Sequence, residues 1–410
     1  MGGTQVSKED YRVLRAAILE SPKNYPLQVT VDSRGERLSI GSFVGVLALR
    51  SGKVLEIVPK CYEGLDKAKR SRVALMRMVA RSGPLPLRVL EKAAQAPSIQ
   101  PLHQILVQSF LDTLEKVLVY GLLSSYSSVA GRRRVLKGKL EASKQVRERT
   151  PIPLTFQTKA QEYRENRPEN RLLRSALDVV VPFADWIFPA RIGRILEYLK
   201  DIEPSRDIPA DFRAWATDRL ASRYSPLEPW CRLILEAAAA PLPGKRRLPG
   251  LLFPMERLFE SYVGSCITEM VPKGYNVVAQ SRRRHLGNRD GKPVALLKPD
   301  FVIRREGVDI SVIDAKWKSL VKEGEMSEAS SSDLYQLYAY GRSYLGGKGK
   351  MALAIPKTDS FKEDLAPIIY AVDPDLSVRY LPINLEGPPL ELREHLSESL
   401  RGEVKETQLC

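Results

Sequence analysis

The chain has 410 residues and is strongly basic, because 64 Lys and Arg residues against 49 Asp and Glu give a formal net charge of +15. This length is sufficient for two domains with separate cores, and the charge favours nucleic acid as a partner over a ribosomal or membrane-surface role. No run of about 18 apolar residues and no signal-peptide core occur, so we expect a cytoplasmic protein without a membrane partner.

Several classes of site are excluded by residue spacing. The four cysteines and three histidines are scattered, which excludes a CxxC-type zinc site, gives no disulfide framework and lends little support to Ser-His-Asp or Cys-His catalysis. The nucleotide-binding pattern GxxxxGK[ST] does not occur. We therefore expect that this chain does not hydrolyse nucleotide itself.

The first part of the chain predicts a mixed β and α module. Apolar residues alternate from Leu27 to Val31, and apolar segments on either side of Ser51-Gly52 predict a hairpin within residues 27–60. A basic helix is predicted over residues 65–80 and an amphipathic helix over residues 103–123.

A basic segment, GRRRVLKGKL, follows these helices. Its charged residues, predicted to lie in a loop after a turn at Gly131, are Arg132, Arg133, Arg134, Lys137 and Lys139. Such a loop can bind DNA, or it can enter a partner nucleotidase and stabilise charge as an arginine finger does. A solvated basic loop without a specific partner is the alternative.

From about Asn166 the pattern becomes helical up to a Pro- and Gly-interrupted loop, residues 240–250. The basic centre of this loop, Lys245, Arg246 and Arg247, is positioned to line a DNA channel. A second basic group, Arg282, Arg283 and Arg284, is a further candidate for binding DNA or a partner.

The helix predicted over residues 255–270 places its apolar residues on one stripe, with Glu260 at the edge of that stripe. Glu260 is therefore either a third acidic metal ligand pointing into a cleft or a solvated helix glutamate.

The segment PDFVIRREGVDISVIDAK contains the most informative pattern. Asp314 and Lys316 share parity on the strand predicted from Val308, and Asp300 comes from the neighbouring strand across a turn at residues 305–307. Two carboxylates and one ammonium group can therefore converge. Phosphodiester hydrolysis requires such a set, with oxygen ligands for Mg²⁺ or Mn²⁺ and a cation near the developing charge. A structural salt bridge at a strand end is the alternative.

The helix predicted over residues 333–345 carries Gln336 and Tyr340 one turn apart, on a different side from its apolar residues. Glu260, Pro299-Asp300, Asp314-Ala315-Lys316 and this QxxxY pair resemble the ordered motifs of the PD-(D/E)xK nuclease superfamily, in its QxxxY branch. More narrowly, LFESYV, DAKWK and DLYQLYAYG are similar to the McrC family, the nuclease subunit of McrBC modification-dependent restriction systems.

The resemblance implies roles for these residues. Asp300 and Asp314, with Glu260 and the Ala315 carbonyl, would hold the metal ion. Lys316 would orient or deprotonate water or offset charge on the phosphate, and Gln336 and Tyr340 would position the scissile strand or the lysine.

The resemblance also implies a fold and partners. We expect a mixed α/β chain, with a β-rich and helical partner-binding domain over residues 1–165. A second domain, 166–410, would comprise a helical segment (166–250) and a PD-(D/E)xK restriction-endonuclease-like core (251–385). The partners would be double-stranded DNA and a hexameric AAA+ ring of McrB type, which binds the GTP and is stimulated by this chain. The alternatives are a stand-alone RecB-like repair or recombination nuclease and an inactive DNA-binding regulator of a motor.

Overall fold

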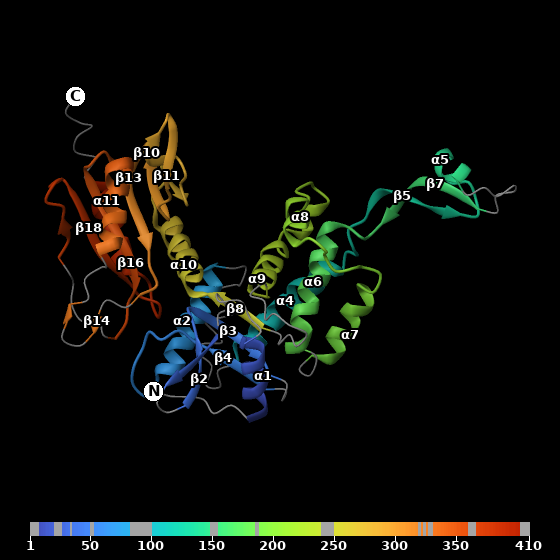
Figure 1. The fold of residues 1–410 in the computed structure, drawn as a ribbon, viewed down its shortest axis with the longest axis horizontal. Helices are drawn as coiled ribbons and strands as arrows, with labels where there is room; N and C mark the ends of the chain where they lie inside the picture. The colour runs from blue at the N-terminus through green and yellow to red at the C-terminus, as the bar shows by residue number, and fades with distance from the viewer. Residues whose placement is uncertain are drawn as a thin grey trace. The chain divides into compact units, whose positions relative to one another are not determined.

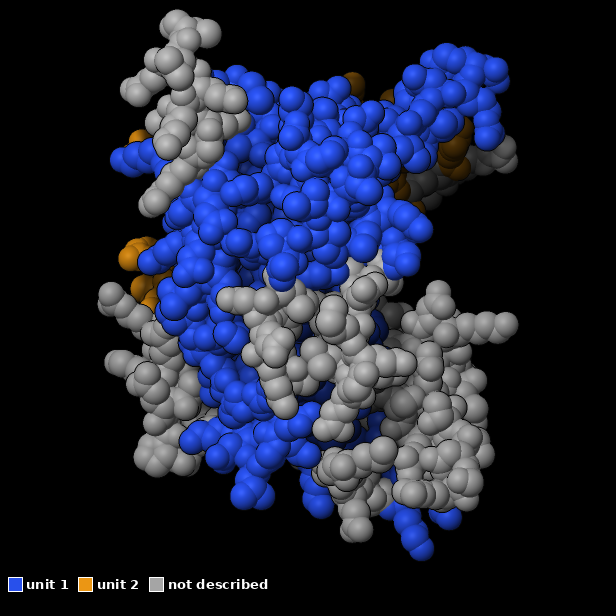
Figure 2. Space-filling model, turned by 90° about the vertical axis from the view of Figure 1, so that its left-hand side faces the viewer, with its two compact units in different colours: residues 1–102, 240–410 blue, residues 103–239 orange. Residues whose placement is uncertain are grey.

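The computed structural model describes most of the chain. The described residues are 8–19, 27–32, 35–49, 53–82, 101–147, 155–184, 188–238, 250–318, 321–322, 325–326, 331–359 and 366–401. They form two compact units, unit 1 with residues 1–102 and 240–410 and unit 2 with residues 103–239 (Figure 2).

The first part of unit 1 contains a three-stranded antiparallel sheet with the order β4-β3-β8. β3 (Phe43–Ala48) lies between β4 (Val54–Ile57) and β8 (Gly250–Pro254), so strands far apart in sequence are joined. Gly45 at the centre of β3 has φ +132°, and a Cβ there would lie 1.9 Å from the carbonyl oxygen of Leu251. This close backbone approach requires glycine.

The remaining elements before residue 83 are helices and a separate hairpin. They are α1 (Lys8–Leu19), β1 (Leu27–Asp32), β2 (Gly35–Ile40) and α2 (Lys67–Ser82). β1 and β2 pair only with each other, and α2 packs against α10 (Met255–Met270).

The second part of unit 1 is built on a six-stranded mixed sheet with the order β17-β18-β16-β13-β12-β9. β13, β16 and β18 are parallel, and the pairs β9–β12, β12–β13 and β17–β18 are antiparallel. Their bounds are β9 (Tyr275–Ala279), β12 (Phe301–Arg305), β13 (Val308–Ala315), β16 (Gly349–Pro356), β17 (Ile368–Ile369) and β18 (Leu376–Ile383).

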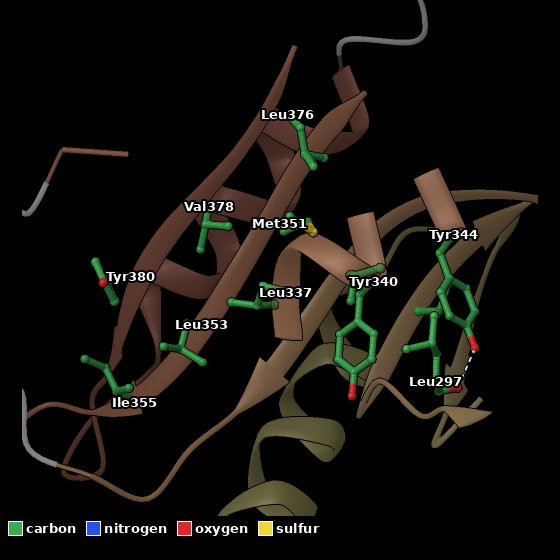
Figure 3. Packing of buried hydrophobic residues seen from close by; sticks show 12 residues of the cluster. Leu297, Leu337, Tyr340, Tyr344, Met351, Leu353, Ile355, Leu376, Val378 and Tyr380 are labelled. Carbon is green, nitrogen blue, oxygen red and sulfur yellow. Dashed lines mark hydrogen bonds between the residues drawn. The ribbon is translucent and has the colours of Figure 1, made fainter. Parts of the chain in front are cut away.

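Helices cover both faces of this sheet. α11 (Ser331–Leu345) packs on one face, where Leu337, Tyr340 and Tyr344 join a buried cluster with Val302 and Val312 (Figure 3). α10 and α12 (Leu390–Arg401) contact each other and the sheet on the other face, where Phe301 lies against Gly264 of α10. Consecutive residues of β13 from Ser311 to Ala315 are consequently all buried.

Two short hairpins lie in connections around this sheet, one between β9 and β12 and the other between β13 and α11. β10 (Arg284–Arg289) pairs with β11 (Lys292–Leu297), and β14 (Val321–Lys322) pairs with β15 (Glu325–Met326). Each forms a two-stranded sheet of its own.

Unit 2 consists of helices and one elongated β-ribbon. The helices are α4 (Leu102–Leu118), which opens the unit, α6 (Pro168–Ala184), α7 (Pro189–Tyr198), α8 (Ile208–Arg213), the 3-10 helix η1 (Ala221–Tyr224) and α9 (Glu228–Ala238). β5 (Ser125–Arg133) and β7 (Phe156–Arg164) pair along their full length, and β6 (Lys139–Leu140) pairs with the other edge of β7. α5 (Ala142–Arg147) follows β6 in the chain. Within this unit the ribbon projects away from α6 (Figure 1). The name arm is used below for residues 125–164.

The predicted mixed α/β class is confirmed, as are the strands within residues 27–60 and the helices predicted near residues 65–80, 103–123, 255–270 and 333–345. The turn predicted at Gly131 is wrong, because β5 continues through Gly131 to Arg133 on its pairing with β7. The predicted loop is present at residues 134–138, between β5 and β6. The domain boundary predicted at residue 165 falls inside unit 2, whereas β3–β8 pairing places residues 1–102 in the same compact unit as residues 240–410. In the described residues no helix is long and apolar enough to cross a membrane.

Candidate active site

Asp300 lies directly before β12, at the end of the sheet where β13 terminates. Its Oδ2 accepts a hydrogen bond of 2.8 Å from the backbone N–H of Ala315, and its own carbonyl accepts one of 2.7 Å from the N–H of Gln280. Phe301 pairs with Ile313, which fixes the start of β12 beside the end of β13. The predicted turn between these strands is present, with Glu306 and Gly307 both at positive φ, as a tight antiparallel hairpin requires.

Asp314 and Lys316 meet at the end of β13. The Lys316 Nζ lies 3.0 Å from Asp314 Oδ2, and the Asp314 side chain is 2% exposed against 33% for Lys316. Lys316 also donates its backbone N–H to the Ala354 carbonyl at 2.9 Å, which extends the parallel pairing by one residue. Both side chains therefore leave the sheet on the α11 face, as the strand parity predicts.

The electrostatics of the site are dominated by carboxylates held close together. Burial raises the pKa of Asp300 from an ordinary value of 3.8 to about 7, and the charges of Asp314 and Glu260 contribute to this rise. Burial alone would lower the pKa of Lys316, but the adjacent Asp314 carboxylate outweighs it and holds that pKa above the usual value. The lysine is consequently an ammonium ion at neutral pH.

The pair Gln336 and Tyr340 faces the same end of the sheet from α11. Gln336 Nε2 donates a hydrogen bond of 2.7 Å to the Tyr340 hydroxyl, which in turn donates one of 3.0 Å to the carbonyl of Lys298. Tyr340 is 3% exposed, and burial raises the pKa of its hydroxyl. The QxxxY pair thus fixes the segment that leads into Asp300.

Glu260 approaches the site from α10 and is held by Gln280, whose side-chain amide donates to Glu260 Oε1. Gln280 therefore joins Glu260 to Asp300 through its side chain and its backbone N–H. It has φ +49°, a backbone conformation uncommon for a residue other than glycine. A hollow of about 270 Å³ beside this pair is lined by Glu260, Thr268, Val277 and Phe301, among others. No sequence pattern identified Gln280.

The residues present fit a divalent cation bound largely by water. In the part of the chain that the structure describes, no group of three or more His, Cys, Asp or Glu side chains is disposed to hold a metal ion. The available protein set is therefore Asp300 and Asp314, with Glu260 engaged by Gln280. Burial, and after it the charges of Asp314 and Glu260, disfavour the charged form of Asp300, and a bound cation would offset both effects. Mg²⁺ commonly binds through one or two carboxylates and keeps several waters, so the donor set suits it.

A second ion pair lies beside the site and was missed from the sequence. Lys318 Nζ contacts Asp333 Oδ2 in the first turn of α11. Burial lowers the pKa of Lys318, and the charge of Lys316 lowers it further. Trp317, between the two lysines, packs edge-on against Phe259 of α10 with ring centroids 5.4 Å apart. The alternation of Lys316 and Lys318 is the signal that could have suggested that both lysines face this end of the sheet.

The basic residues predicted after Gly131 differ in their contacts and exposure. Arg133 is engaged by Glu162 at 2.6 Å and by Thr158, so it stabilises the arm, whereas Arg134, Lys137 and Lys139 are exposed. Arg132 is also exposed. None of these arm residues is near the Asp300 site along the chain.

The two other predicted basic groups are residues 282–284 and residues 245–247, and the structure describes only the first of them. Arg282, Arg283 and Arg284 are all exposed, and Arg283 is paired with Asp309 at 2.8 Å. Lys245, Arg246 and Arg247 lie outside the described residues.

The mixed sheet brings Asp300, Asp314 and Lys316 together at the end of β13. These features define the class of protein, which is an α/β protein with a buried acidic site. The family follows from the sequence comparison. The chain belongs to the McrBC 5-methylcytosine restriction system component family, whose model matches residues 38–355.

A solved structure supports the same fold. The chain is similar to a protein in the Thermococcus gammatolerans half-complex of McrB AAA+ hexamers with bound McrC, from a tetradecameric assembly. The TM-score is 0.57 at 20% identity, over 91% of this chain and 85% of that chain. A cryo-EM structure of the Thermococcus gammatolerans McrBC complex gives a TM-score of 0.41 at 18% identity, over 68% of this chain and 82% of that chain. No curated protein sequence matches the chain.

Proposed function

We propose that this protein is the metal-dependent DNA endonuclease subunit of an McrBC-like restriction complex. The observation that carries the proposal is the convergence of Asp300, Asp314 and Lys316 at the end of β13, within a chain of the McrBC family. A structural salt bridge alone would not require Asp300, whose charged form is disfavoured by its surroundings.

Asp300 and Asp314 would hold Mg²⁺ or Mn²⁺, with the Ala315 carbonyl and Glu260 as further candidate oxygen donors. When bound, such an ion polarises the phosphate and lowers the pKa of water. The protein's contribution is a fixed position for both carboxylates. The N–H of Ala315 holds Asp300, and Lys316 holds Asp314.

Lys316 would act as a cation rather than as a base. Its pKa is raised by Asp314, so it keeps its proton at neutral pH and can donate hydrogen bonds to the phosphate or to the attacking water. Charge on the phosphate increases toward the transition state, and a fixed ammonium group stabilises that charge without reorganisation.

Gln336 and Tyr340 would position the segment before Asp300. Tyr340 accepts a hydrogen bond from Gln336, which orients its hydroxyl, and it donates one to the Lys298 carbonyl, which restrains the segment that leads into Asp300. The Gln336 side chain has remaining donor and acceptor capacity for the DNA backbone.

The partner would be an AAA+ GTPase ring of McrB type, since this chain resembles in fold a protein from an assembly of McrB hexamers with McrC. The arm is the element that we assign to this contact. Arg134, Lys137 and Lys139 are exposed on it, and its Val135 and Leu136 are 73% and 55% exposed. Exposed apolar side chains beside basic ones are typical of an interaction surface.

The deciding experiment combines the purified chain with methylated and unmethylated plasmid DNA and Mg²⁺, with and without the McrB-type partner and GTP. We expect cleavage only with partner and GTP, and none with Asp314→Asn. Cleavage by the chain alone would support the stand-alone nuclease. Inactivity of the complete complex with Mg²⁺ and Mn²⁺, despite DNA binding, would support the inactive regulator.

A further inference from the structure

The β10–β11 hairpin is an exposed two-stranded ribbon outside the main sheet (Figure 1). Its strands are joined at Asp290 and Gly291, both at positive φ, which is the signature of a tight type I′ turn. A two-stranded hairpin is marginally stable by itself in water, so this one depends on how its base is anchored.

Three contacts anchor the base. Leu297 is buried in the α11 cluster, and its carbonyl accepts a hydrogen bond of 3.1 Å from the Tyr344 hydroxyl (Figure 3). Arg283 pairs at 2.8 Å with Asp309 of β13, the strand that also carries Asp314. The hairpin is therefore held on the same body as the candidate active site.

Beyond this base the hairpin is almost entirely exposed. Every residue from Asn288 to Leu296 is exposed, and the apolar side chains of Leu286 and Leu296 are 63% and 45% exposed. These side chains are therefore available for contact with a partner.

The hairpin is also strongly basic. Arg284, Arg289 and Lys292 form no ion pair with any described residue, and Asp290 is the sole acidic residue between Arg282 and Lys298. Arg289 and Lys292 face each other across the ladder, next to the turn. Like charges placed opposite each other destabilise a ribbon, and an anionic partner would remove this cost.

The hairpin runs away from the active site along α11. Lys298 is bonded to Tyr340 and Leu297 to Tyr344, one turn further along the helix. From Asp300 back to Asp290 the chain spans at most about 33 Å in extended form, which is close to one turn of duplex DNA. A two-stranded ribbon also fits the width of the major groove.

We propose that the β10–β11 hairpin binds duplex DNA up to about one helical turn from the scissile phosphate. Arg284, Arg289 and Lys292 contact phosphates, and Leu286 and Leu296 contact the groove. The inference rests on the proposed nuclease function. A second copy of this chain is a poorer occupant of the same surface, because two basic hairpins would repel each other.

The test measures DNA affinity of the full chain without divalent metal, so that binding is read independently of cleavage, on duplexes of 12 and 40 base pairs at several salt concentrations. For Arg289→Ala/Lys292→Ala we expect affinity for the long duplex to fall on the order of tenfold. The slope of log K against log salt should become shallower by about two, because each of the two cations neutralises about one phosphate. On the short duplex, which is only slightly longer than one helical turn, few binding positions allow contact with both the active site and the hairpin, so the difference between the variant and the unaltered protein should be smaller.

Two control variants accompany this measurement. Arg289→Lys/Lys292→Arg keeps the charge and should keep the slope, whereas Lys67→Ala/Lys69→Ala removes the same charge from exposed positions of α2 and should leave the slope unchanged. Circular dichroism of each variant confirms that the fold is retained.

The outcomes separate the hairpin from the nuclease proposal. An unchanged salt slope, an equal decrease of affinity in the α2 control, or a change in sedimentation with unchanged DNA affinity would overturn the role of the hairpin. A sedimentation change would indicate an interface between protein copies. Retained hairpin effects on binding, in a complex that cannot cleave DNA, would overturn only the nuclease function.

Discussion

The carboxylate of Asp300 accepts a hydrogen bond from the backbone N–H of Ala315, one residue beyond Asp314. The start of β12 is thereby tied to the end of β13 through an acidic side chain rather than through the sheet ladder alone. This bond favours the charged form of Asp300 but is too weak to offset burial and the neighbouring carboxylates. The hydrogen bond therefore fixes the position of the Asp300 carboxylate, while burial and the neighbouring carboxylates disfavour its charged form.

Replacing Asp314 with Asn should abolish cleavage and preserve DNA binding. The substitution keeps the shape and removes the charge that holds Lys316 and a cation, so we expect at least about a 100-fold decrease in cleavage rate. Binding should be equal or tighter, because a negative charge leaves a phosphate site. Plasmid nicking and gel-shift assays measure the two effects, with exposed Asp375→Asn as control. Retained cleavage would exclude Asp314 from the site.

The stability of the metal-free protein should depend on Asp300. Its folded pKa of about 7 exceeds the ordinary value of 3.8, so its contribution is fully favourable below pH 3.8 and is lost as pH rises through 7. Asp300→Asn should therefore raise stability at pH 8 relative to the unaltered protein, by at most about 4 kcal/mol, and change little at pH 4.

Thermal unfolding from pH 4 to 9 in chelator tests this expectation, with Asp375→Asn as the exposed control. Added Mg²⁺ should stabilise the unaltered protein at pH 8 and have a smaller effect on Asp300→Asn. Equal pH profiles for both proteins would contradict the charge balance described for the site.

Exchanging the partners of the Lys318–Asp333 pair should reveal a positioning role. This pair joins the segment after β13 to the first turn of α11, where Asp333 lies one helical turn before Gln336. We expect Lys318→Asp and Asp333→Lys each to lower kcat about tenfold, and the double exchange to restore part of it. The same exchange in the exposed Lys348–Asp375 pair is the control, and it should leave kcat unchanged. If the double exchange restores nothing while KM rises in every Lys318 variant, Lys318 binds DNA directly.

Tyr340→Phe should separate the contribution of the packed ring from that of the hydrogen bonds of the hydroxyl. The ring stays in the α11 cluster, but the hydrogen bonds of its hydroxyl to the Lys298 carbonyl and to Gln336 are removed. We expect about 1–2 kcal/mol lower stability and a reduced cleavage rate. Denaturant unfolding and single-turnover cleavage measure these quantities, and Tyr338→Phe on the same helix is the control. A variant with unaltered cleavage would restrict the QxxxY pair to a structural role.

Removing the exposed charges of the arm should weaken the stimulation of the partner's GTPase activity by this chain. Arg134→Ala/Lys137→Ala/Lys139→Ala should reduce the GTPase stimulation of an McrB-type partner at least about tenfold, since none of these side chains belongs to the Asp300 site. Arg164→Ala, on the same ribbon and paired with Glu162, is the control. GTP turnover at saturating partner checks the effect, and unchanged stimulation would remove the arm from that role.

Sequence patterns predicted that the side chains of the candidate active site lie close together, because the residues are near one another in the chain. Asp300, Asp314 and Lys316 lie within one hairpin, so strand parity alone places them together. Helix periodicity likewise placed Gln336 and Tyr340 one turn apart, although it gave no indication that Tyr340 would bond to Lys298.

The remaining features depend on contacts that periodicity does not encode. Gln280 links Glu260 to Asp300 through a left-handed backbone conformation, and no residue type demands that conformation at this position. The pairing of β3 with β8 crosses more than 200 residues, which made the compact units differ from the predicted domains. Basic residues also look equivalent in sequence, yet Arg133 and Arg283 are engaged by Glu162 and Asp309.

The β3–β8 pairing has a consequence for synthesis on the ribosome. One edge of β3 lacks its native partner until residues 250–254 emerge, after roughly 200 further residues have been translated. At about 5–20 residues per second this interval lasts about 10–40 s. During that time unit 2 is completed as a continuous segment, while the amino-terminal sheet keeps an open edge that can pair with a neighbouring nascent chain. This edge is therefore open before the six-stranded sheet, which lies almost entirely after residue 274, has begun to form.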